Sequence, residues 1–126
     1  IAKWEGVRLR DVLALVEKTD EARYVMVTSF GHVGHTYDGR PTEPYYECLD
    51  VSMAMEDETI LAWGMNDKPL PDVHGGPLRL RADSMHGYKM VKWVRKIEWI
   101  NDYRDVGDGQ GGSREDSGLQ HFDARA

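Results

Sequence analysis

The residues best suited to chemistry lie between positions 61 and 93, where glycines and basic residues interrupt an apolar pattern. Residues 74–77 (His-Gly-Gly-Pro) predict a tight turn, because glycine lets the backbone approach a ligand closely. Arg79 follows on an expected strand, and Lys89 and Lys92 come shortly afterwards. A guanidinium on a strand matches a phosphate through paired, charge-assisted hydrogen bonds. The pattern is compatible with the binding of a phosphorylated ligand.

The same basic residues have a simpler interpretation. Arg79 and Arg81 alternate with Leu78 and Leu80, which is typical of a half-exposed strand with one solvated face. Periodicity alone favours the solvated face, and the ligand site is the alternative hypothesis.

Composition restricts the classes of function. The chain has 126 residues, of which 40% are hydrophobic, so it can form one domain with a sizeable core. The formal net charge is −6, which opposes binding to a phosphate backbone and argues against a nucleic-acid partner. Cys48 is the single cysteine, so no internal disulfide can form.

The elements that must position these residues follow from hydrophobic periodicity. An amphipathic helix is expected at residues 9–18, and one or two helical turns capped by Asp50 are expected at 50–55. Strands are expected at 23–29, 60–65, 77–82 and 91–100. Residues 31–44 form a long polar loop, and residues 66–69 have turn chemistry. This order predicts an α+β domain dominated by mixed or antiparallel sheet.

A longer pattern connects these elements to a known family. Met-Asn-x-x-Pro-Leu-Pro-x-x-His-Gly-x-Pro-Leu-Arg-Leu starts at Met65, and Gly-Tyr-Lys-x-Val-Lys-Trp starts at Gly87. Together they resemble the sulfite oxidase and plant nitrate reductase family, including its bacterial methionine-sulfoxide-reductase relatives. The Trp-Glu-Gly-Val segment from Trp4 resembles the W-x-G-V segment of that family, and residues 106–122 resemble a bacterial subgroup. The likeness covers nearly the whole chain.

The resemblance implies a β-rich, mixed-sheet sulfite-oxidase-type molybdopterin-binding fold, present as its C-terminal larger part. It divides the chain into a molybdopterin-binding domain at residues 1–105, lacking its N-terminal portion, and a glycine-rich extension at 106–126. The cysteine that ligates molybdenum in the family is expected before Ile1. No catalytic residue and no metal ligand is therefore expected within the chain, and Cys48 is expected to be a small, half-buried hydrophobic residue.

Residues that would contact the cofactor are transferred position by position from the resemblance. The implied cofactor-binding residues are His74, Arg79, Met90, Val91, Lys92 and Ser29. Arg79 would bind the phosphate, and Met90 and Val91 would contribute backbone groups. From the residues themselves, a shallow basic groove is expected where Arg79, Lys89 and Lys92 meet.

The function implied by the resemblance is that of a molybdenum-dependent oxidoreductase, with molybdopterin as its cofactor. It would transfer an oxygen atom on a small substrate, either an oxyanion such as sulfite or a sulfoxide, and pass electrons to a separate haem protein. The family favours a periplasmic location. The 126-residue chain by itself is expected to be inactive and prone to self-association. The alternative is a non-catalytic molybdopterin-fold fragment or binding module.

Overall fold

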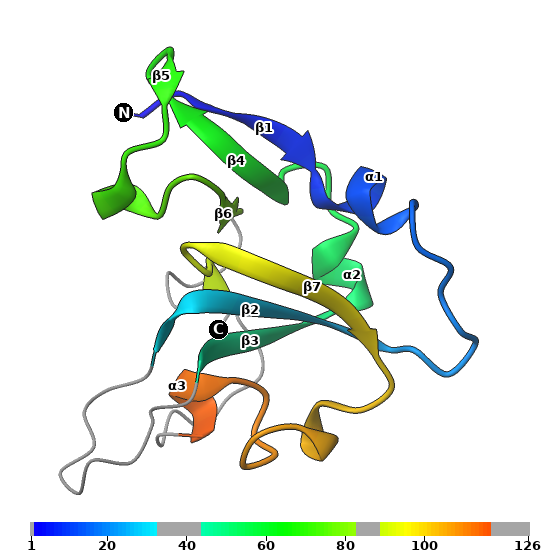
Figure 1. Cartoon of the computed structure of the whole chain (residues 1–126). Coiled ribbons are helices and arrows are strands. Elements are labelled where there is room, and N and C mark those ends of the chain that lie inside the picture. The colour runs from blue at the N-terminus through cyan, green and yellow to red at the C-terminus, as the bar shows by residue number, and fades with distance from the viewer. Residues whose placement is uncertain (1, 33–43, 83–88, 117–126) are drawn as a thin grey trace, which may run out of the picture.

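The computed structural model describes residues 2–32, 44–82 and 89–116. Within these ranges the chain forms two antiparallel sheets (Figure 1). In the first sheet, β4 (Ile60–Met65) pairs with β1 (Trp4–Arg8), β5 (Lys68–Pro69) and β6 (Arg79–Arg81). In the second sheet, β2 (Tyr24–His32) lies between β3 (Pro44–Asp50) and β7 (Val94–Ile100). The expected α+β class with a predominance of sheet is confirmed.

The hydrophobic core joins both sheets. Two short helices, α1 (Leu9–Leu13) and α2 (Val51–Ala54), lie at the same end of the sheets (Figure 1). Both helices contribute to the core cluster, which consists of Leu9, Leu13, Val25, Val27, Leu49, Met53, Ala54, Leu61, Leu80, Ala82, Val91 and Val94. Burying one aliphatic side chain of this kind stabilises a fold by roughly 1.5–3 kcal/mol. Val91 and Leu80 tie the candidate site to this core.

Several local predictions are confirmed. Strand β4 has the predicted bounds. Asp50 caps α2, because its side chain accepts a hydrogen bond from the Met53 amide at 2.8 Å. Asn66 and Asp67 adopt positive φ angles of 54° and 66°, as the tight turn from β4 to β5 requires. On β6, Leu80 is buried while the two arginines are half-buried, as the alternation predicts.

Other predicted bounds were wrong, for identifiable reasons. Helix α1 ends at Leu13 instead of continuing to residue 18, and Leu15 and Val16 are 83% and 62% exposed. The apolar periodicity of a helix therefore continues in the sequence beyond Leu13, the last residue of α1 that packs in the core. The alternation expected over residues 91–100 is interrupted at Trp93, whose φ is 51°, so β7 begins at Val94.

Strand β3 was not predicted, because its burial hides the alternation that identifies a half-exposed strand. Residues 46–49 are all buried. One face of β3 meets the core, and the C-terminal segment with helix α3 (Ser113–Asp116) covers the other. The Cys48 amide donates to the Gly111 carbonyl at 2.9 Å, and the Tyr46 amide donates to Ser113 Oγ at 2.9 Å.

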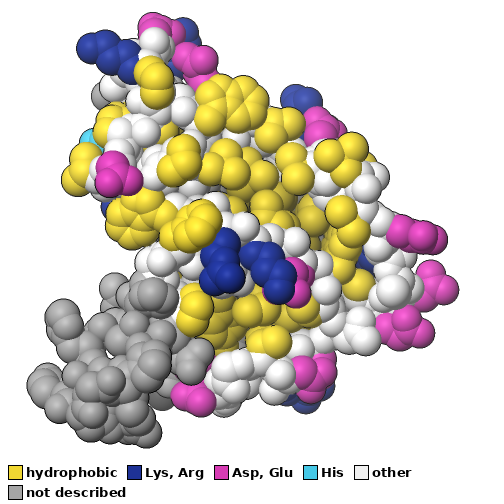
Figure 2. All heavy atoms as spheres, in the orientation of Figure 1, with side chains coloured by type: hydrophobic (Ala, Val, Ile, Leu, Met, Phe, Trp, Pro, Cys, Tyr) yellow, Lys and Arg dark blue, Asp and Glu magenta, His cyan; other side chains and the backbone are white. Residues whose placement is uncertain are grey.

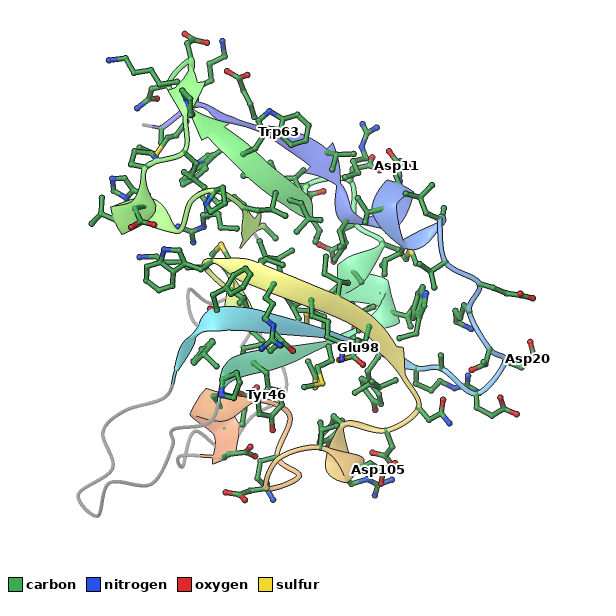
Figure 3. All side chains as sticks on the ribbon, in the orientation of Figure 1. Asp11, Asp20, Tyr46, Trp63, Glu98 and Asp105 are labelled. Atoms are coloured by element: carbon green, nitrogen blue, oxygen red, sulfur yellow. The ribbon has the colours of Figure 1, made fainter. Side chains whose placement is uncertain are left out.

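The C-terminal segment packs closely, at least as far as Asp116. After β7 the chain forms a 3₁₀ turn, η3 (Tyr103–Asp105), and then α3. The Tyr46 hydroxyl donates to Asp116 Oδ2 at 2.5 Å, and Tyr46 lies beside α3 in Figure 3. The described part of the expected extension thus forms one wall of the domain.

Some apolar surface remains open to solvent. A groove of about 530 Å³ runs between α1 and β7 and is lined by Val12, Val16, Ile97 and Trp99 among others. Figure 2 shows a broad area of hydrophobic side chains on the face that it displays, with acidic side chains mostly near its edges.

No helix within the described ranges has the length and apolar composition needed to cross a bilayer.

Candidate functional site

Three stretches of chain meet at the candidate site. Strand β6 carries Arg79, a turn at residues 71–77 precedes it, and a segment at residues 89–93 leads into β7. Backbone hydrogen bonds join them: the Leu80 amide donates to the Val91 carbonyl at 2.8 Å, and the Trp93 amide donates to the Gly75 carbonyl at 3.0 Å. The two motifs quoted from the sequence therefore lie side by side in the fold.

Glycines make this close approach possible. Gly75 has a φ of 99°, and a Cβ atom there would lie 2.7 Å from Lys92 Cγ. A Cβ atom on Gly76 would lie 2.0 Å from the Leu70 carbonyl oxygen. The turn includes the 3₁₀ element η1 (Asp72–His74), whose backbone meets Lys92 and Trp93. The predicted tight turn is present, and it holds Lys92 against Arg79.

Arg79 is the centre of the site. Its Nη1 donates to the His74 carbonyl at 3.1 Å, and its Nη2 lies 3.5 Å from the Met90 carbonyl. Partial burial, together with the positive charge of Arg81, lowers the pKa of Arg79 from its usual value. Its orientation is thus set by both neighbouring segments.

An aromatic ring supports two arginines at once. The Arg79 and Arg81 guanidinium carbons lie 5.2 Å and 5.0 Å from the centroid of the Trp4 ring on β1. Such contacts contribute about 0.5–2 kcal/mol each. Trp4 is placed by a bulge between Glu5 and Gly6, where a Cβ atom on Gly6 would lie 2.1 Å from the Leu61 carbonyl oxygen. The Trp-x-Gly-Val segment therefore has a physical role in forming this cluster.

Arg79 and Lys92 have no carboxylate partner within the described ranges. Lys92 Nζ instead lies 3.3 Å from the Val73 carbonyl and 5.7 Å from the centroid of the Trp93 ring. Cations held close together at one site, such as Arg79 and Lys92, favour a bound anion. We call Arg79, Arg81, Lys92 and Trp4 the arginine–tryptophan cluster.

The remaining residues expected from the resemblance lie around this cluster in different ways. His74 is exposed and contributes its carbonyl to Arg79. Met90 lies between the arginines: its carbonyl is near Arg79, and its sulfur accepts from Arg81 Nη1 at 3.0 Å. Val91 is buried, and its backbone links the segment to β6.

Ser29 lies behind the cluster. Its buried hydroxyl donates to the Lys92 carbonyl at 2.8 Å and accepts from the Gly31 amide at 2.8 Å. Both contacts are internal, so in this arrangement Ser29 supports the backbone at Lys92.

Lys89 corrects the expected basic groove. Instead of lining a groove with Arg79 and Lys92, its side chain is fully buried on the opposite side of the segment. Its ammonium lies 3.1 Å from Glu47 Oε1 and 2.5 Å from Glu115 Oε2. The sequence indicated a cation near the glycine turn, but it contained no signal that distant carboxylates surround it.

Cys48 lies on β3 and is fully buried, where the sequence predicted a half-buried residue. Burial, as the largest cause, raises the pKa of its thiol to about 12, which disfavours the thiolate that binds metals. Within the described ranges, no group of three or more His, Cys, Asp or Glu side chains is placed to hold a metal ion. Residues 33–43, which include most of the predicted polar loop at 31–44, lie outside the described residues.

Sequence reasoning missed two members of the cluster. In the sequence, Trp4 marked only the start of a family segment, and Arg81 was treated only as part of a strand face. The available signal was the two-residue spacing of the arginines on one face of a strand. The sequence did not indicate that Trp4 would lie against that face, because β1 and β6 pair with opposite edges of β4.

Comparison with known proteins gives a consistent result. The family model described as "Oxidoreductase molybdopterin binding domain" matches residues 1–106. The protein-methionine-sulfoxide reductase catalytic subunit MsrP of Xanthomonas axonopodis pv. citri is 34% identical over 103 residues, covering 79% of this chain and 32% of that protein. Mouse mitochondrial sulfite oxidase is 34% identical over 102 residues, covering 76% of this chain and 17% of that protein. The chain therefore spans a third or less of the length of these relatives.

The fold is also similar to a solved structure. The sulfane dehydrogenase SoxCD from Paracoccus pantotrophus matches with a TM-score of 0.65 at 21% identity, over 86% of this chain and 26% of that chain. This likeness confirms the expected sulfite-oxidase-type fold.

Proposed function

Because this chain belongs to the oxidoreductase molybdopterin binding domain family, we propose that its full-length protein is a molybdenum-dependent oxidoreductase of the sulfite oxidase type. The proposal extends to the whole protein what its relatives are named for, since the chain covers 32% of MsrP and 17% of sulfite oxidase. When bound, the cofactor would supply oxygen-atom transfer chemistry, and the chain described above would bind and orient it.

The observation that carries the proposal is the arginine–tryptophan cluster. It presents guanidinium groups over one indole ring, with Lys92 nearby and no carboxylate paired with Arg79 or Lys92 among the described residues. A phosphorylated ring system suits such donors, because the guanidinium groups match the phosphate. The residues present therefore fit the phosphate end of molybdopterin.

We assign roles to this chain accordingly. Arg79 would bind the phosphate, with Lys92 as a second cation. His74, Met90 and Val91 would line the cofactor, and Ser29 would hold the backbone at Lys92. Cys48 is not assigned to the metal, because burial disfavours its thiolate.

The substrate is proposed only as a class. The relatives include a sulfoxide reductase subunit and a sulfite oxidase. We propose oxygen-atom transfer on a small oxyanion or a sulfoxide. Electrons would pass to a haem protein that is a separate partner, and a purified haem protein that the reduced enzyme reduces would support this step.

The test uses the full-length protein with Arg79→Ala. Removing one partner of a desolvated charge pair costs on the order of 2–5 kcal/mol, so molybdopterin content should fall sharply while the fold persists. Arg79→Lys should also be impaired, because a point charge cannot replace the planar fork. The readouts are fluorescence of the released pterin, molybdenum by mass spectrometry and thermal unfolding.

The matched control is Arg104→Ala, since Arg104 is an exposed arginine of η3 that pairs with Asp102 at 2.7 Å. It should leave cofactor content unchanged. Normal cofactor content in Arg79→Ala would contradict the assignment of the phosphate site. A wild-type full-length protein that binds no molybdopterin would contradict the proposed function.

A further inference from the structure

Behind the arginine–tryptophan cluster lies a second group of charges that the proposed function does not use. The Lys89 ammonium lies 3.1 Å from Glu47 Oε1 and 2.5 Å from Glu115 Oε2, and all three side chains are 0% exposed. It also donates to the Cys48 carbonyl at 2.7 Å. We call Glu47, Lys89 and Glu115 the buried triad. It joins β3, the start of segment 89–93 and helix α3.

The triad contains two carboxyl groups and one ammonium. Burial, followed by the hydrogen bond and charge of Glu115, raises the pKa of Glu47 to about 8, and Lys89 opposes the change. At neutral pH the raised pKa favours the protonated form of Glu47, which reduces the charge that is buried in the interior.

The triad is connected to the site through the backbone of segment 89–93. The Lys89 side chain enters the interior, whereas the next residue, Met90, has its sulfur 3.0 Å from Arg81 Nη1 and its carbonyl 3.5 Å from Arg79 Nη2. Two residues later, the Lys92 carbonyl accepts from Ser29. Segment 89–93 is thus bonded to the buried triad through Lys89, and it contacts Arg79 and Arg81 through Met90.

Stability alone is a weak explanation for such a triad. Replacing a buried ion pair or triad by well-packed apolar residues is often neutral or stabilising in proteins. What an apolar replacement cannot supply is directional bonding from two other segments, β3 and α3, to one ammonium. The triad is better explained by the fixed position that it gives to Lys89.

We propose that Lys89 is a positioning residue, whose buried bonds to Glu47 and Glu115 fix segment 89–93 so that Met90 and Lys92 keep the arginine–tryptophan cluster arranged for its anionic cofactor. This inference rests on the proposed function and deepens it. It also assigns a role to Glu115, which lies beyond the residues matched by the family model.

The test compares variants of the full-length holoprotein. Lys89→Met removes the ammonium at similar volume, and Glu115→Gln removes one carboxylate without changing shape. The buried control is Thr59→Val, because Thr59 is fully buried and its hydroxyl donates to the Met53 carbonyl at 2.8 Å, near α2. The readouts are the rate of molybdopterin release, amide hydrogen exchange at Trp93, and thermal unfolding of the cofactor-free protein.

We expect Lys89→Met to release molybdopterin on the order of 10–100-fold faster, as is found when a supporting group behind a ligand is removed. Glu115→Gln should show a smaller change of the same kind. Both should exchange the Trp93 amide, which donates to the Gly75 carbonyl, faster than the wild type. Thr59→Val should lower thermal stability without changing the rate of molybdopterin release or the exchange of the Trp93 amide. If Lys89→Met does not fold, the proposal is tested by molybdopterin release and Trp93 amide exchange in Glu115→Gln.

A pH series tests whether the protonation of Glu47 is coupled to cofactor release. The ionisable groups that face Glu47 are Lys89, Glu115, Tyr45 and Cys48. Cofactor release from the wild type should accelerate as pH rises from roughly 6 to roughly 9, a range that extends about one to two pH units to either side of the Glu47 pKa. Glu47→Gln, which cannot ionise, should flatten that profile.

Two results would overturn the inference. One is cofactor release that tracks thermal stability alone, so that Thr59→Val releases it as fast as a triad variant of equal stability. The other is unchanged release in both Lys89→Met and Glu115→Gln. A wild-type protein without molybdopterin would instead remove the proposed function, and this is measured before any variant is made.

Discussion

Lys89 and Lys92 belong to the same short segment, yet their surroundings are opposite. Lys89 is fully buried between two carboxyl groups that neutralise it. Lys92 is half-buried beside Arg79, and among the described residues it has no carboxylate partner. The comparison shows that the type of residue does not determine its role. A cation with internal counter-charges acts as a structural anchor, whereas a cation without them is available to an external anion.

Among the substitutions considered, the largest effect on stability is expected at Lys89. Lys89→Met leaves two carboxyl groups buried without a cation, and breaking a buried ion pair in this way typically costs about 3–5 kcal/mol. We expect the free energy of unfolding to fall by this amount at about pH 7, because carboxylates that become exposed to water on unfolding are charged at that pH. Urea denaturation measures it.

The control for this substitution is Lys96→Met. Lys96 pairs with Glu98 at 3.4 Å, but its side chain is 60% exposed. An exposed pair contributes at most about 1 kcal/mol. Equal losses in the two variants would show that Lys89 is not an anchor.

The proton in the buried triad gives a second prediction. The pKa of Glu47 is raised from 4.5 to about 8 in the folded protein, so the folded state binds a proton more tightly than the unfolded state. The free energy of unfolding should therefore fall as pH rises from 4.5 to about 8 and level off above that range. The slope from this group is at most about 1.4 kcal/mol per pH unit. Urea denaturation across this range should show that the free energy of unfolding depends less steeply on pH in Glu47→Gln. Identical slopes in the variant and the wild type would contradict the raised pKa of Glu47.

On the other side of the segment, Trp4 supports both arginines. Trp4→Leu in the full-length protein removes the aromatic face under Arg79 and Arg81, and we expect molybdopterin affinity to weaken by about 1–2 kcal/mol. The matched control is Trp63→Leu, since Trp63 on β4 is 51% exposed. Cofactor titration of the two variants measures the difference. Equal affinities would mean that the indole does not organise the arginines.

The smallest effect is expected at Cys48. Cys48→Ser should keep full molybdenum content and lose about 1 kcal/mol of stability, from burying a hydroxyl in place of a thiol. Because burial raises the pKa of the thiol to about 12, the native protein should resist thiol reagents at pH 8 (roughly the pKa of a free thiol) and react only on unfolding. Loss of molybdenum from a folded Cys48→Ser protein would show that the ligand was assigned wrongly.

Local signals predicted the front of the site well. The glycine turn, the arginines on one face of β6 and the Asp50 cap each depend on residues close together in the sequence. The motif itself placed Arg79 and Lys92 in one site, and the backbone bonds between β6 and segment 89–93 explain why.

The back of the site could not be predicted in this way. Lys89 meets Glu47 and Glu115 only because β3 and α3 pack together, and neither contact has a periodic signal. Burial on both faces also hid β3, since its residues 46–49 lack the alternation that marks a strand. Long-range electrostatic pairing depends on the tertiary fold, which a single sequence does not encode in a local pattern.

The contact between Lys89 and Glu115 also constrains the order of biosynthesis. Glu115 is made after every other described residue of the site, and only its arrival completes the surroundings of the Lys89 ammonium. During translation, a nascent chain that has emerged only as far as β7 would have the arginines but no closed wall behind segment 89–93. Domains complete their packing when their last segments become available. The packing behind segment 89–93 is therefore complete only after α3 has been translated.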